Sequence, residues 1–172
     1  MASVAVIRKF LWVIPVLLGL VFIGAGAYMI SEGRAAKDDV HQALTAENVV
    51  TAEDASIPKA LVHNVSTAEA QDAIIRQHSL ETTEGKTYAE LPRDDPNRGV
   101  YLNGVTLRTA LSLAVMGFRV SDLVVGLGVF MVVIGASHIF VLAPTMFWMR
   151  NAPSATGASG SGRVPVHPAP TA

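Results

Sequence analysis

Two long apolar runs without charge, at residues 10–30 and 123–148, constrain the fold of this chain more than any other feature. A membrane-spanning helix needs roughly 20 mostly apolar residues to cross about 30 Å of hydrocarbon, and both runs reach that length. The chain is 51% hydrophobic and 16% charged, so it is more apolar than an average soluble domain. The runs predict a mainly α fold: an antiparallel two-helix transmembrane hairpin with a small, mostly helical extracytoplasmic domain at residues 31–122.

The distribution of charge predicts the orientation of this hairpin. The basic residues outside residues 31–122 are Arg8, Lys9, Arg150 and Arg163, whereas all 14 Asp and Glu residues lie inside that segment, which has a net charge of −5. Basic residues near the ends of spanning helices are retained on the cytoplasmic side. We therefore expect a two-pass plasma-membrane protein with both termini in the cytoplasm.

The terminal segments complete this division of the chain. Residues 1–9 are expected to be a cytoplasmic N-terminus, and the Gly-, Ser- and Pro-rich residues 149–172 a disordered cytoplasmic tail. Trp12 and Trp148 lie at the terminal ends of the two runs, where indole rings favour the headgroup layer. An alternative is that the first run is a signal peptide cleaved near residues 25–27, which are small. The run continues to residue 30, which favours a retained anchor.

The middle segment contains signals for two helices. Ser66 and Glu69 have the spacing of a capping box, which predicts a helix from Thr67 to about Glu81. After a cluster of turn-forming residues at 94–99, a second helix is predicted from Thr106 to Trp148. Such a helix is about 64 Å long at 1.5 Å per residue, roughly twice the thickness of the hydrocarbon. We therefore expect its outer half to stand above the membrane.

Small residues on this second helix recur at an interval of seven. In lipid, helices associate largely through close backbone contact at small residues, and an interval of seven suits a shallow crossing. The sequence leaves open whether this row packs against the first run, through Gly19, Gly24, Gly26 and Ala27, or against another membrane subunit. The candidate helix-packing residues are Ala114, Gly117, Ser121, Gly128 and Gly135.

His138 lies within the second run and is the candidate polar residue inside the membrane. An ionisable group at this depth suggests a function such as proton relay or contact with a quinone or haem. A neutral imidazole can instead be satisfied by a helix carbonyl, and we favour this structural interpretation. Arg119 and Asp122 are three residues apart and are expected to pair at the outer interface. Pro15 and Pro144 are expected to kink the two helices.

The sequence shows no pattern typical of an active site. It contains no cysteine, no G-x-S-x-G nucleophile elbow and no P-loop. Its histidines have none of the spacings typical of metal ligands, and the best local group of carboxylates and imidazole is Asp38, Asp39 and His41. We therefore predict no catalytic residue, no metal ligand and no cofactor, and a chain that is not an enzyme.

Parts of the chain resemble a known family. The stretches at residues 70–75, 78–81, 85–91 and 95–96, together with the Leu-Val-Val-Gly-Leu-Gly-Val run at 123–129, are similar to an actinobacterial family of small two-span membrane proteins. Members often carry the label "aromatic ring-opening dioxygenase". The resemblance implies a plasma-membrane protein and supplies no catalytic residue, because the ligands of an iron site do not match.

These observations favour a non-enzymatic accessory or scaffold protein. It would present its extracytoplasmic domain to a larger membrane or envelope assembly, with Tyr88 and Leu91 as candidate contact residues. The expected partners are the lipid bilayer and a membrane protein or further copies of the chain, and no nucleic acid is expected. The alternatives are an extracytoplasmic sensor or receptor and, third, a membrane redox enzyme that uses His138 or the group around His41.

Overall fold

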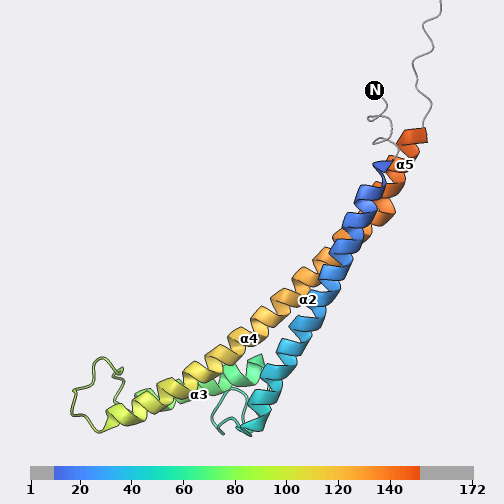
Figure 1. Ribbon diagram of the computed structural model, residues 1–172. Coiled ribbons are helices and arrows are strands. Elements are labelled where there is room, and N and C mark those ends of the chain that lie inside the picture. Colours follow the sequence, from blue (N-terminus) through green and yellow to red (C-terminus); the bar gives the residue numbers. More distant parts are fainter. Residues whose placement is uncertain (1–9, 152–172) are drawn as a thin grey trace, which may run out of the picture.

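The computed structural model describes residues 10–151, so the predicted segment 1–9 and the predicted tail from 152 onward lie outside the described residues. Helix α2 spans Val13–Ala46, α3 spans Val65–Thr82 and α4 spans Asn97–Ser137. A π-helical turn, η1, follows at His138–Leu142, and α5 continues it at Ala143–Asn151 (Figure 1). Within residues 10–151 the chain forms no strand beyond one isolated bridge between Val50 and Leu61. The predicted mainly α fold is confirmed.

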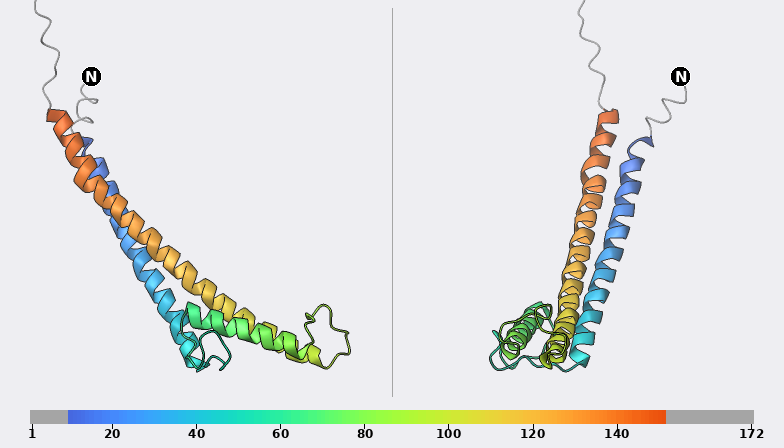
Figure 2. Two further views of the ribbon diagram at one scale, coloured as in Figure 1. Left: turned by 180° about the vertical axis from the view of Figure 1, so that it is seen from behind. Right: turned by 90° about the vertical axis from the view of Figure 1, so that its left-hand side faces the viewer.

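The two long helices lie side by side and run in opposite directions (Figures 1 and 2). Helix α4 with its continuation to Met149, like α2, is long and apolar enough to cross a membrane. The start of α2 lies beside α5 at one end of the molecule, and α3 packs on α4 at the other end. We call residues 31–122, which include α3 and the outer parts of α2 and α4, the head.

Helix α4 begins well before Thr106, where the sequence analysis placed its start. The helix begins inside the turn-forming cluster at 94–99 and not after it. Asp95 Oδ1 accepts a hydrogen bond from the Asn97 backbone N–H at 2.8 Å and so stabilises this start. Pro96 precedes the first turn with a φ of −62°, which is helical, and its missing N–H costs nothing there. The helix also continues past Trp148, so the first residues of the predicted tail are helical.

The amino-terminal cap of α3 differs from the predicted one. Asn64 is the cap, since its side chain accepts from the Thr67 backbone N–H at 3.0 Å and the Asn64 N–H donates to the Thr67 hydroxyl at 3.2 Å. The helix therefore starts at Val65, and the predicted pair of Ser66 and Glu69 does not cap it. An Asn side chain provides the same acceptor as a Ser hydroxyl, so sequence spacing alone does not separate the two registers.

We expect Asn64→Ala to lower the free energy of unfolding of the head by about 1 kcal/mol, because it removes the acceptor for an amide that no helix carbonyl can satisfy. Ser66→Ala is the matched control, and we expect no comparable loss from it. Thermal unfolding followed by circular dichroism measures both variants. A larger loss with Ser66→Ala than with Asn64→Ala would restore the predicted cap.

The two prolines that were expected to kink the helices have different effects. Pro15 lies in the first turn of α2, where no intrahelical hydrogen bond is lost. Pro144 follows η1, in which the Ala143 N–H donates to the His138 carbonyl, a wider spacing than in an α-helix. The π-helical turn thus accommodates the carbonyls that a proline leaves without their usual donor.

The core of the head forms where α3, α4 and the loop at 47–64 meet. Val62 and Ala68 are fully buried and contact Leu111 of α4. Gly104 of α4 approaches α3 so closely that a Cβ there would clash with the Ser79 hydroxyl. Partly buried side chains from three segments surround this core: Leu44, Ile75 and Val115.

Candidate functional site

The closest approach between α2 and α4 is a seam of small residues. A Cβ on Gly26 would lie 2.5 Å from the Gly128 carbonyl oxygen, and a Cβ on Gly135 would lie 2.6 Å from the Gly19 carbonyl oxygen. These distances leave no room for a side chain, so the two backbones are in direct contact. The seam consists of three facing pairs: Gly19 with Gly135, Gly26 with Gly128, and Gly33 with Ser121.

The structure brings several of the predicted helix-packing residues into or beside this seam. Ser121, Gly128 and Gly135 lie in it and are buried. Gly117 lies beside it, because a Cβ there would meet a Val40 methyl at 3.0 Å. Ala114 is half-buried farther along the same helix. Of the row expected on α4, Ser121, Gly128 and Gly135 therefore pack against α2.

The expected partner face on α2 is only partly right. Gly24 has open space around it and Ala27 is exposed, so neither belongs to the seam. Gly33, which was not predicted, completes the face with Gly19 and Gly26. The signal that would have identified Gly33 is the interval of seven, which on α2 selects residues 19, 26 and 33. The same interval excludes Gly24, which is five residues from Gly19.

Ion pairs between helices lie just beyond the outer end of the seam. Lys37 Nζ of α2 lies 2.7 Å from Asp122 Oδ1 of α4, and Arg119 pairs with Glu69 of α3. The predicted pairing of Arg119 with Asp122 is therefore wrong, since each residue has a partner on a neighbouring helix. Gly33 faces Ser121. The charged residues that directly follow the apolar run of α2 and precede that of α4, Glu32 and Asp122, therefore lie at about the same level along the two helices.

A second ion pair ties α3 to α4 closer to the head core. Arg108 Nη2 lies 3.3 Å from Asp72 Oδ2, and Arg108 Nε lies 3.3 Å from Asp72 Oδ1. Both side chains are about three-quarters buried. A guanidinium in this side-on arrangement orients α3 on α4 as well as neutralising the carboxylate.

The tertiary structure brings together two histidines that the sequence separates. The rings of His41 and His63 are 5.5 Å apart and nearly perpendicular, and His41 Nδ1 donates to the His63 backbone carbonyl at 2.8 Å. They line a hollow of about 360 Å³ with Lys37, Asp38 and Phe118. Asp39, the third member of the predicted group, does not line it. These contacts join the end of α2 to the segment that precedes α3.

His138 makes its hydrogen bond within its own helix. Its Nδ1 donates to the Ile134 carbonyl at 2.8 Å, and its ring lies 5.9 Å from that of Phe22 on α2. A helix carbonyl is the partner that the structural interpretation of His138 requires. Because Nδ1 donates to it, Nε2 carries no proton in the neutral ring. The residue thus contributes to packing between α2 and the start of η1.

The two candidate contact residues have different environments. Tyr88 is 37% exposed, and the Arg98 guanidinium lies 4.0 Å from the centre of its ring. Leu91 is only 4% exposed, so its side chain is buried. Arg98 Nη1 donates to the Leu91 carbonyl at 2.6 Å and thereby holds the loop around Leu91 against the start of α4. Of the two residues, Tyr88 is the one available to a partner.

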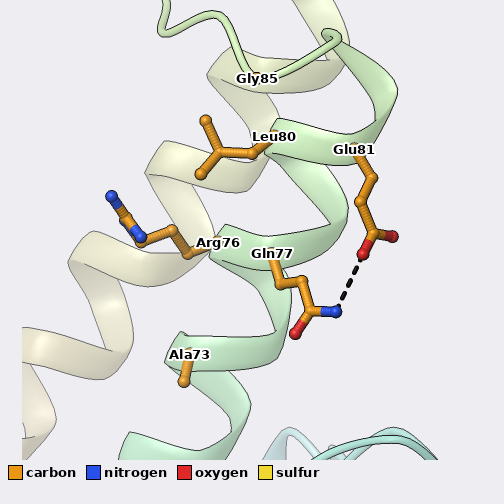
Figure 3. Close-up of a pocket in the computed structure, with 6 residues that line it drawn as sticks. All are labelled: Ala73, Arg76, Gln77, Leu80, Glu81 and Gly85. Carbon is orange, nitrogen blue, oxygen red and sulfur yellow. Dashed lines mark hydrogen bonds between the residues drawn. The ribbon is translucent and has the colours of Figure 1, made fainter.

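A further hollow lies along α3 (Figure 3). It is an open depression of about 470 Å³, lined by residues including Arg76, Leu80 and Gly85. Gln77 Nε2 donates to Glu81 Oε1 at 2.9 Å along its edge. Because no buried polar group converges on it, the depression has the character of a helix surface and not of a ligand site.

Two exposed carboxylates of the head have lowered pKa values. His78 Nε2 donates to Asp54 Oδ2 at 2.7 Å, which lowers the pKa of Asp54. The backbone N–H and the hydroxyl of Thr87 both donate to Glu90, which lowers the pKa of Glu90. Each carboxyl is harder to protonate in the folded chain than in the unfolded chain. Its contribution to stability is therefore present above the unfolded pKa and is lost as the pH falls through the lowered folded pKa.

We expect His78→Ala to return the pKa of Asp54 toward its ordinary value of 3.8, because the first cause of the shift is this hydrogen bond. The pKa of Glu90, whose donors are on Thr87, should not change and serves as the internal control. An NMR titration of the side-chain carboxyl carbons measures both. An Asp54 titration that is identical in the two proteins would show that His78 does not bond it in solution.

Among residues 10–151, no group of three or more His, Cys, Asp or Glu side chains is placed to hold a metal ion. Comparison of the chain with protein-family models, with curated proteins and with solved structures finds no match. The features of the molecule that bear on its function are the seam, the ion pairs at its outer end and the exposed surfaces of the helices.

Proposed function

We propose that this chain is an integral plasma-membrane protein with an accessory or scaffold role. In this proposal, α2 and α4 with α5 form a transmembrane hairpin, and the head lies in the extracytoplasmic space. The head then offers its surface, including Tyr88, to a larger membrane or envelope assembly. Both chain ends are assigned to the cytoplasm, as the basic residues near them favour.

The observation that carries this proposal is the exposure of the apolar halves of the two long helices. Only 17% of the most apolar stretch of α2 and 11% of that of α4 are buried within the molecule. The glycine seam brings the helices into backbone contact, so their large side chains point outward, among them Leu17, Val21, Leu123 and Phe130. A core helix of a soluble protein buries such side chains, whereas a spanning helix presents them to lipid.

The placement of charge supports the same boundary. The pair of Lys37 and Asp122 and the pair of Arg119 and Glu69 lie at the outer end of the apolar halves, where a headgroup layer would meet them. On α2, no Asp, Glu, Lys or Arg occurs before Glu32. Hydrocarbon covering residues 10–30 and 123–148 would therefore enclose no charged side chain.

Single cysteines test the topology directly, because the native chain has none. In intact cells, we expect a membrane-impermeant maleimide to label Asn103→Cys in the head and to label Ser154→Cys only after permeabilisation. Both variants should stay in the membrane fraction after an alkaline carbonate wash. Release by the wash, or equal labelling at both sites in intact cells, would contradict the proposal.

The accessory role is tested by purification of the full chain in a mild detergent, followed by mass spectrometry. We expect a second protein in fixed proportion to the native chain and a weaker association with Tyr88→Ala. Leu107→Ala, an exposed change elsewhere on the head, is the control. Recovery of the native chain with no other protein would contradict a scaffold role while leaving the membrane topology intact.

A further inference from the structure

One face of α4 carries an uncharged row of exposed side chains that neither α2 nor α3 covers. Helix α2 packs on the face with Gly117, Ser121 and Gly128, and α3 packs near Gly104 and Leu111. Successive residues of the row are separated by four and three positions in turn, and the same spacing continues from Leu123 to Phe130. Its outer part consists of Leu102, Thr106, Thr109, Leu113, Met116 and Val120, all exposed.

The two threonines do not make this row polar. The Thr106 hydroxyl donates to the Leu102 carbonyl at 3.0 Å, and the Thr109 hydroxyl donates to the Val105 carbonyl at 2.8 Å. Both hydroxyls are thus satisfied within the helix, and the methyl groups are available for apolar contact. The row is therefore continuous in character from Leu102 to Phe130.

Lipid does not account for the outer part of the row. From Leu102 to Val120 it covers about 27 Å of helix, beyond the level at which Lys37 pairs with Asp122. Arg108 and Arg119 lie on the same stretch of α4 and bond to α3. Hydrocarbon deep enough to cover Leu113 would also enclose the pair of Arg119 and Glu69, which is costly.

We propose that the row is the interface between two copies of this chain, joined as a parallel α4–α4 coiled coil about a two-fold axis along the membrane normal. This inference rests on the proposed function, since a common orientation in one membrane makes the two copies parallel. Alternating steps of four and three apolar residues over about four heptads are the pattern of a coiled-coil seam.

The composition of the row is compatible with packing against a copy of itself. In an isologous pair each residue of a parallel seam meets its own counterpart, and no Asp, Glu, Lys or Arg occurs in the row to create a repulsive pair. The row passes without a break from the head into the membrane-spanning half. One contact therefore covers both the part of the row that faces water and the part that faces lipid.

Disulfide crosslinking of the full chain in native membranes tests this interface. Leu113 and Leu107 are both 57% exposed on the same helix, but only Leu113 lies in the row. Cysteines bridge only when their Cα atoms are within about 7 Å. With a mild oxidant, we expect Leu113→Cys to convert mainly to a species of twice the chain mass, and Leu107→Cys to remain at the mass of one chain.

Equal crosslinking of the two variants, no crosslinking of either, or crosslinking of Leu113→Cys to a different protein would overturn the proposal. As a second measurement, Met116→Lys should halve the mass of the purified protein in detergent, whereas Leu107→Lys should not change it. A chain that stays monomeric but resists the carbonate wash and shows the expected labelling would overturn the dimer alone. A chain released by the wash would contradict the membrane function as well.

Discussion

Gly128→Ala is expected to destabilise the hairpin, although alanine is the better helix former. A Cβ at this position would lie 2.7 Å from the Gly26 carbonyl oxygen and 3.0 Å from the Ile30 backbone nitrogen. Backbone atoms cannot rotate aside as a side chain does, so the helices must separate along the seam. Overpacking of this kind costs about 1–3 kcal/mol, which exceeds the gain of about 1 kcal/mol in helix propensity.

Gly126→Ala is the matched control, two residues away on the same helix. A Cβ at Gly126 meets nothing within 4 Å, so the gain in helix propensity should remain and this variant should be slightly more stable than the native chain. Thermal unfolding of the purified proteins in the same detergent compares the midpoints. Opposite shifts are expected; equal shifts of the same sign would show that α2 and α4 are not in backbone contact at this point.

Phe118→Ala is expected to be the most damaging single change in the head. Its ring is 3% exposed and lines the hollow that contains His41 and His63, where α2, α4 and the start of α3 meet. Removing a buried aromatic ring costs about 3–5 kcal/mol, because the lost contacts are only partly replaced when the surroundings relax. We expect the loop at 47–64 to loosen, which limited proteolysis detects as faster cleavage.

Leu107→Ala provides the comparison for Phe118→Ala, since Leu107 is on the same helix and is exposed. It should change neither the unfolding midpoint nor the rate of cleavage. The pairs of Gly26 with Gly128 and Gly19 with Gly135 lie ten or more residues from Phe118 along α4, so the packing of α2 on α4 there should persist when the head loosens. Slow cleavage of the loop at 47–64 in Phe118→Ala, as in the native chain, would show that the ring does not hold the head together.

Local signals in the sequence were sufficient for the elements but not for their ends. The long apolar runs and the Ala- and Leu-rich segments predict helices because each satisfies its own backbone hydrogen bonds. The start of α4 at Asn97 and the cap at Asn64 were missed, since several nearby residues offer equivalent acceptors. Which of them is used depends on where the neighbouring helix places the chain.

The partners of the charged residues were likewise beyond the sequence. Spacing along one helix suggested that Arg119 and Asp122 pair, whereas packing supplies Glu69 from α3 and Lys37 from α2. The contact of His41 with His63 has the same origin, because the two residues are 22 positions apart and meet only when the loop folds back on α2.

The two apolar runs and the small residues at an interval of seven are properties of the sequence itself, because length, hydropathy and helical period are local. The tertiary structure decided which glycines touch. It pairs Gly19, Gly26 and Gly33 with Gly135, Gly128 and Ser121, and leaves Gly24 and Gly126 in open space. The physical reason is that two antiparallel helices can bring only one face of each into backbone contact, and their relative rotation is set by packing along the whole length of both.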